Sequence, residues 1–295
     1  MDYVYSMVIL IGLFVILASS FNLIIGYGGL ISIAHPIFYG IGAYTSALLT
    51  RDLGLPVPLG IVAGALLAIA LSVAMALPAL RVSGDYLLIA SIGFQLGMIE
   101  LIKNVRFTGG ASGVSGIPPF LVPTFGREAY VALVVVVAIS VVLLVRWIAH
   151  SDYGRAISAM RDDEQAFAAL GRDAKWIKVS LFALGSGIAG FAGALYAHYF
   201  RFVTSEQFEI LMSAALLTMV VVGGLRTPWG PVVGAIMLQS LPQAITFLNL
   251  PPALLGPLQG LLFTGLVLVF MFMRPGGLVQ AGNTWRAQNT GRRGS

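Results

Sequence analysis

Apolar residues run along this chain in stretches of about 20, the length that an α-helix needs to cross a bilayer core about 30 Å thick. Short polar interruptions separate the stretches. The pattern predicts an all-α polytopic membrane protein with about nine transmembrane segments. These segments cover roughly residues 4–25, 31–50, 58–80, 86–103, 128–148, 177–200, 209–223, 230–248 and 255–273.

One long polar segment, residues 151–178, interrupts this pattern and holds 10 of the 29 charged residues. Asp162 or Asp163 can cap a short helix there by accepting from backbone N–H groups. Gly171 stands where a left-handed residue would end that helix. Helices this short need a surface to rest on. The segment is therefore either a docking element for a cytosolic partner or a solvated loop lying against its own membrane domain.

That short helix is expected to present one apolar face. Ala166, Phe167 and Leu170 fall together at helical spacing. Such a face would suit a groove on a partner protein. Upstream, Ile157 and Met160 lie three residues apart in a second short amphipathic pattern.

Composition supports the membrane class and excludes others. The chain has 295 residues, of which 58% are hydrophobic and 10% are charged, whereas a soluble domain carries about 25% charged residues. The net charge of +5 does not indicate nucleic-acid binding, because the cations gather at helix ends. The absence of cysteine excludes disulfides, thiol catalysis and cysteine metal sites. No cofactor and no metal ion are expected.

Charge distribution predicts the orientation. If residues 151–178 are cytosolic, 12 of the 17 basic residues lie inside and 5 lie outside, as the positive-inside rule requires. The N-terminus is then outside and the C-terminus inside. The start of the chain lacks the basic region of a signal peptide, so its first apolar run should remain as a span. We expect a membrane domain over residues 1–275 and a polar, disordered cytosolic tail over 276–295.

The second predicted segment is expected to be a broken or re-entrant helix. Pro36 would remove the helical hydrogen bond to the carbonyl group of Ser32, which then needs another partner or must line a wet cavity. Broken helices at membrane depth often build substrate paths. The alternative is a structural kink whose histidine bonds to a neighbouring helix. The predicted path is lined by Ser32, His35, Pro36, Tyr39 and Gly40.

Small residues mark two further features. Residues 108–119 form a glycine-rich loop that lacks the lysine of a phosphate-binding loop. We expect it outside the membrane, where it either faces a partner, caps the pathway or is a flexible connection. Along residues 177–200 small side chains recur every four positions, which predicts close helix packing. The two stripes are Ser186, Gly190 and Ala194, and Ala189, Gly193 and Ala197.

Four motifs in order carry a family resemblance: residues 26–44, with the run Gly26, Tyr27, Gly28 and Gly29 followed by His35; 108–118; 190–197; and 223–235. With them the chain resembles the LivH/LivM-type permeases of branched-chain amino acid ABC importers, and it is closer to the LivM branch. The resemblance covers about residues 22–275. Departures include Leu30, Pro36, Ser112 and Arg226, which stand where the family usually has other residue types.

The resemblance implies a transport subunit rather than an enzyme, located in the bacterial inner membrane. It implies a second, homologous permease subunit, two cytosolic ATPase subunits and a periplasmic substrate-binding protein as partners. Residues 163–171 resemble a degenerate coupling loop, in which Gln165 holds the usual acidic position. The implied coupling residues are Asp163, Glu164, Gln165, Ala166, Phe167, Leu170 and Gly171.

Other functions compete with this interpretation. A urea or short-amide ABC permease would share the scaffold. An ion-coupled carrier or channel would also explain a broken second helix, but such carriers generally place ionisable residues along the path. Here His35 and His198 are the candidates within spans. An intramembrane enzyme is disfavoured, because the three histidines show no catalytic or zinc-binding spacing.

Overall fold

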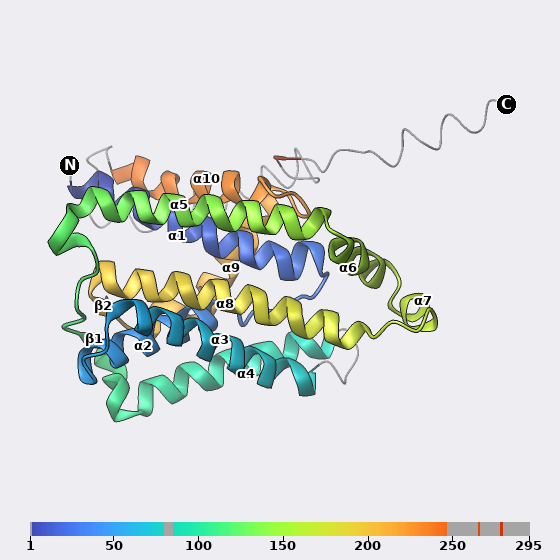
Figure 1. Cartoon of the computed structure of the whole chain (residues 1–295), viewed down its shortest axis with the longest axis horizontal. Helices are drawn as coiled ribbons and strands as arrows, with labels where there is room; N and C mark the ends of the chain where they lie inside the picture. Colours follow the sequence, from blue (N-terminus) through green and yellow to red (C-terminus); the bar gives the residue numbers. More distant parts are fainter. Residues whose placement is uncertain (1, 80–84, 247–264, 266–277, 280–295) are drawn as a thin grey trace.

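The computed structural model describes residues 2–79, 85–246, 265 and 278–279 and is almost entirely helical (Figure 1). The predicted ninth segment, 255–273, and the tail, 276–295, fall outside the described residues apart from these isolated positions. The long helices are α1 (Asp2–Asn22), α2 (His35–Asp52), α3 (Val57–Ala79), α4 (Asp85–Asn104), α5 (Val122–His150), α8 (Ala174–Phe200), α9 (Ile210–Gly223) and α10 (Gly230–Thr246). The short elements are α6 (Asp152–Asp162), α7 (Glu164–Ala169), the π-turn η1 (Leu23–Tyr27), the 3₁₀ turns η2 (Arg106–Thr108), η3 (Gly110–Ser112) and η4 (Ser205–Phe208), and the strands β1 (Val114–Ser115) and β2 (Phe202–Val203).

The membrane class predicted from the sequence is confirmed. Within the described part of the chain, six helical stretches are long and apolar enough to cross a bilayer. They are Tyr3–Tyr27, Val57–Ala79, Tyr86–Asn104, Phe125–His150, Ala174–Phe200 and Ser205–Gly223. Helix α2 is shorter, and so is the apolar part of α10. The first eight predicted segments overlap α1, α2, α3, α4, α5, α8, α9 and α10, but the predicted count of nine spans is not shown.

Three glycines bring α2, α3 and α8 into backbone contact. A Cβ atom on Gly42 would lie 2.0 Å from the carbonyl oxygen of Gly190, and one on Gly64 would lie 2.7 Å from the carbonyl oxygen of Gly42. One on Gly193 would lie 1.9 Å from the carbonyl oxygen of Tyr39. The packing role predicted for the small-residue stripes of α8 is thus confirmed, and the packing is internal to this chain.

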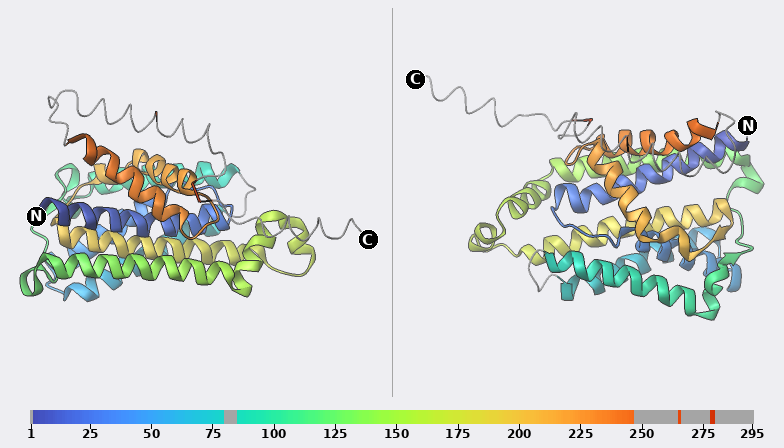
Figure 2. Two further views of the ribbon diagram at one scale, coloured as in Figure 1. Left: turned by 90° about the horizontal axis from the view of Figure 1, so that it is seen from above. Right: turned by 180° about the vertical axis from the view of Figure 1, so that it is seen from behind.

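Helix α1 lies within the bundle, next to α8 and α10 (Figure 2). Its most apolar stretch is 78% buried, compared with 39%, 28% and 33% for those of α3, α4 and α5. It also contacts α5 and α9. The apolar surfaces of α3, α4 and α5 that remain exposed are suited to lipid or to a partner subunit.

The glycine-rich loop is ordered at the end of the bundle away from α6 and α7 (Figure 1). Val114 pairs with Val203 and Ser115 with Phe202 in a two-stranded antiparallel ribbon. The Nδ1–H group of His198 donates to the Pro118 carbonyl oxygen at 2.8 Å, and its Nε2 lies 2.8 Å from the Ser46 hydroxyl. This ribbon is the one departure from the all-α prediction among the described residues.

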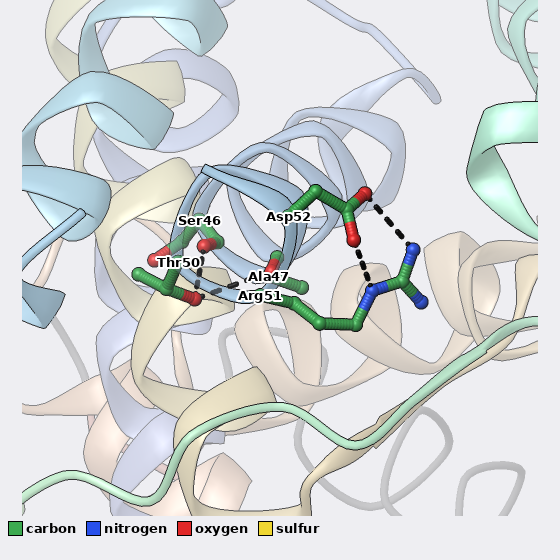
Figure 3. A network of polar contacts seen from close by, with 5 residues as sticks. All are labelled: Ser46, Ala47, Thr50, Arg51 and Asp52. Atoms are coloured by element: carbon green, nitrogen blue, oxygen red, sulfur yellow. Dashed lines mark hydrogen bonds and ion pairs between the residues drawn. The ribbon is translucent and has the colours of Figure 1, made fainter. Parts of the chain in front are cut away.

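Helix α2 ends at the same side of the bundle (Figure 1). Figure 3 shows the polar contacts of its last turns. The Thr50 hydroxyl donates to the carbonyl oxygen of Ser46 at 2.8 Å, within its own helix. The guanidinium of Arg51 donates two hydrogen bonds to the carboxylate of Asp52, at 2.6 and 3.0 Å. An exposed ion pair of this kind contributes little to stability, but it marks the place where the helix meets polar surroundings.

Candidate transport site and motor-docking segment

A non-helical stretch, residues 28–34, separates α1 from α2, and we call it the α1–α2 break. It follows the π-turn η1 and turns back into the bundle (Figure 2). This stretch lies before α2, which runs unbroken from His35 to Asp52, so the structure does not show the broken or re-entrant second helix predicted near Pro36. Pro36 stands in the first turn of α2, where a backbone N–H has no helical partner, so the proline removes no hydrogen bond.

Side chains from α4 and α9 bind the backbone of this break. The backbone N–H of Ile33 donates to the Ser91 hydroxyl at 3.0 Å, and the Ser213 hydroxyl donates to the Ile33 carbonyl oxygen at 2.7 Å. The same hydroxyl lies 3.1 Å from Oε1 of Gln95, whose amide nitrogen donates to the carbonyl oxygen of Phe208 at 3.1 Å. The polar cluster of Ser91, Gln95 and Ser213 thus joins the α1–α2 break to the 3₁₀ turn η4.

This cluster was not predicted from the sequence. Ser91 and Gln95 are four residues apart in an otherwise apolar segment, which places them on one helical face. All three members are buried. Buried polar groups in a bilayer need partners inside the protein. The spacing of Ser91 and Gln95 could therefore have predicted that this face of α4 bonds to backbone outside the regular helices.

The predicted path residues lie on the inner side of the break. His35 is buried, its Nε2 is 2.9 Å from the Ser20 hydroxyl, and its ring centroid is 5.0 Å from that of Phe21. Tyr39 packs against Tyr196 and Phe208.

Two further residues of the predicted path, Gly40 and Ser32, are also buried. A Cβ on Gly40 would lie 2.8 Å from the ring of Phe208. Ser32 is buried, and its hydroxyl accepts from the Ala34 backbone N–H at 3.3 Å. The exposed positions on the break are Gly29 and Ile31, the latter 57% exposed.

The polar segment forms a helical hairpin, α6 followed by α7, that extends beyond the bundle (Figure 1). Ser151 begins α6 by accepting from the Gly154 N–H at 3.2 Å. Asp163 begins α7 by accepting from the Ala166 N–H at 2.9 Å, which confirms the predicted cap. Gly171 has a φ of +76° just after α7, as predicted for a left-handed end.

The predicted apolar face of α7 is wrong in one respect. Phe167 is only 4% exposed, so it packs within this chain, whereas Leu170 is 81% exposed. Ala166 and the polar residues Asp163, Glu164 and Gln165 are also exposed. Glu164 pairs with Lys178 of α8 at 2.6 Å. The α6–α7 hairpin is thus anchored by Phe167, Ile157 and Met160 and presents Leu170 outward.

A multi-pass helical bundle that partly buries non-helical backbone between its helices suits a membrane transport protein. Residues 3–272 match the family described as the permease component of the branched-chain amino acid transport system. The chain belongs to this family, and it is an ABC permease subunit rather than an enzyme.

Relatives agree with this assignment. The chain is 32% identical to the high-affinity branched-chain amino acid transport system permease protein LivM of Escherichia coli, over 90% of this chain and 68% of the relative. It is 24% identical to a probable LivM permease of Methanocaldococcus jannaschii, over 93% and 92%. It is 27% identical to the autoinducer 2 import permease LsrC of Salmonella typhi, over 63% and 55%. No solved structure matches the chain.

Proposed function

We propose that this chain is one of two permease subunits of an ATP-driven importer that carries branched-chain amino acids across the bacterial inner membrane. The family match over residues 3–272 carries the proposal. The α6–α7 hairpin supports it, because a capped, outward-facing helix at one end of the bundle suits a motor protein. ATP hydrolysis then belongs to separate subunits.

The proposed partners are a second, homologous permease subunit, two cytosolic ATPase subunits and a periplasmic substrate-binding protein. Exposed apolar surface on α3, α4 and α5 is available for the second permease and for lipid. The hairpin is available for an ATPase. The coupling residues on it are Asp163, Glu164, Gln165, Ala166, Leu170 and Gly171, with Phe167 as the internal anchor.

The α1–α2 break is the proposed wall of the transport path. A zwitterionic amino acid needs both donors and acceptors as it loses water, and non-helical backbone supplies both. Ile31 and the half-buried Ile33 can contact an apolar side chain. Ser32, His35, Pro36, Tyr39 and Gly40 hold the wall in place from behind, so that their effect on transport is exerted through the break.

Reconstituted transport tests the proposed function. Proteoliposomes containing both permeases and the ATPases, with the binding protein outside, should accumulate labelled leucine only when ATP is inside. Unlabelled isoleucine and valine should compete, whereas urea should not. The matched control uses ATPase subunits that bind but do not hydrolyse ATP. Accumulation of leucine without ATP, or competition by urea alone, would contradict the proposal.

Orientation and path are tested by single cysteines, which this cysteine-free chain allows. Exposed Ser115→Cys should react with an impermeant maleimide in intact cells, and exposed Ala159→Cys only in inside-out vesicles. The reverse labelling of these two positions would invert the topology.

Ile31→Cys in the assembled transporter should react with the same maleimide more slowly when leucine and the binding protein are present. An unchanged rate of labelling at Ile31 would exclude the break from the path.

A further inference from the structure

The end of α1 is held by one side chain from the α6–α7 hairpin. Arg161, in the last turn of α6, donates a hydrogen bond from Nη1 to the carbonyl oxygen of Gly26 in the π-turn. Carbonyl groups at a helix end lack helical partners, and a cation there is favourable. This contact joins residues 135 positions apart in the sequence.

The contact continues onto the α1–α2 break itself. Gly29 has a φ of +67°, and a Cβ atom there would lie 2.7 Å from Cγ of Arg161. The aliphatic part of Arg161 therefore rests on the first exposed residue of the break, while its guanidinium holds the turn before it. A side chain at position 29 would push the two apart.

The other side of the turn is fixed by the connection between α9 and α10. The Asn22 amide donates to the Thr227 carbonyl oxygen at 2.9 Å, and its oxygen accepts from the Arg226 N–H at 3.3 Å. Burial, and then the nearby Arg226, lower the pKa of Arg161, whereas Asp162 opposes this shift. Arg161 is thus a half-buried cation that donates a hydrogen bond to the π-turn.

Arg161 is also close to the motor-docking helix along the chain. Asp163 ends α6 and, at the same time, caps α7. Only Asp162 separates Arg161 from this shared residue, so no flexible linker lies between α7 and the contact with Gly26.

We propose that Arg161 is the positioning residue through which movement of α7 reaches the α1–α2 break, so that the hairpin and the transport path move together. The inference rests on the proposed function, since it needs a motor at α7. It adds to that function one specific contact, between Arg161 and Gly26, which a substitution can remove while the ATPases stay bound.

The test compares three variants in the complete transporter in proteoliposomes. Arg161→Ala should retain the ATPases and hydrolyse ATP, but leucine taken up per ATP should fall roughly tenfold, the size of a typical coupling between sites. Arg161→Lys keeps one charged donor and should recover part of the loss. Arg155→Ala is the matched control, because Arg155 lies on the same helix but is exposed and pairs with Asp152.

A distance measurement separates coupling from simple destabilisation. Spin labels on Ala159→Cys and Ile31→Cys should report an ATP-dependent change in the wild-type background that Arg161→Ala abolishes. Normal uptake per ATP in Arg161→Ala would overturn the inference, and so would loss of the ATPases from that variant, because the residue would then only anchor the hairpin. A wild-type transporter without ATP-driven uptake would instead refute the proposed function.

Discussion

Replacing Gly42 by alanine is expected to prevent stable folding of the permease. The new Cβ atom would lie 2.0 Å from the carbonyl oxygen and 2.4 Å from the Cα atom of Gly190, and both are backbone atoms that cannot rotate away. Overpacking of this kind costs about 3 kcal/mol, and here α2 and α8 would have to separate. Size-exclusion chromatography of the heated, detergent-solubilised protein should show loss of the monodisperse peak at a much lower temperature.

Gly97→Ala is the control for this substitution. Gly97 lies inside α4, and a Cβ atom there would meet no atom within 4 Å. Alanine should therefore leave stability unchanged or raise it by about 0.5–1 kcal/mol, since glycine is a poor helix former. If Gly42→Ala were as stable as Gly97→Ala, the close contact between α2 and α8 would be contradicted.

Leu170→Asp is expected to release the ATPase subunits while leaving the permease folded. Leu170 is 81% exposed at the end of α7, so the charge costs little in this chain alone. Burying the leucine against a partner is worth about 2 kcal/mol, which corresponds to roughly 30-fold in affinity, and a buried carboxylate would add to the loss. Co-purification of the ATPases with the tagged permease measures the effect.

Two variants control for the Leu170 result. Leu53→Asp places the same charge on a leucine that is 69% exposed at the opposite end of the bundle, and it should retain the ATPases. Leu170→Met keeps the apolar contact and should also retain them. Equal retention by Leu170→Asp would show that the motor binds elsewhere. Phe167→Asp is less informative, because Phe167 is buried and its loss would unfold the hairpin.

The caps of α7 were predictable because they depend on neighbours in the sequence. Asp163 needs only an N–H group three residues on, and Gly171 needs only a left-handed backbone. The directions of Phe167 and Leu170 were not predictable from helical spacing. They depend on which side of α7 meets the rest of the chain, and contacts with α6 and α8 decide that.

The α1–α2 break illustrates the same limit at the candidate site. The glycines after residue 25 and Pro36 indicated irregular backbone, but they predicted a broken second helix, whereas the non-helical stretch lies before an unbroken α2. The backbone of Ile33 is bound by residues 58 and 180 positions away. Local propensity carries no information about such partners, so Ser91 and Ser213 appeared as isolated serines in apolar segments.

The burial of α1 has a consequence for the biogenesis of this protein. Helix α1 precedes, along the chain, all four of the helices α5, α8, α9 and α10 that cover its apolar surface. None of these neighbours has been synthesised when α1 enters the bilayer. Lipid or an insertion factor must therefore occupy the surface of α1 until these later helices have been translated, so α1 is packed well after it is inserted.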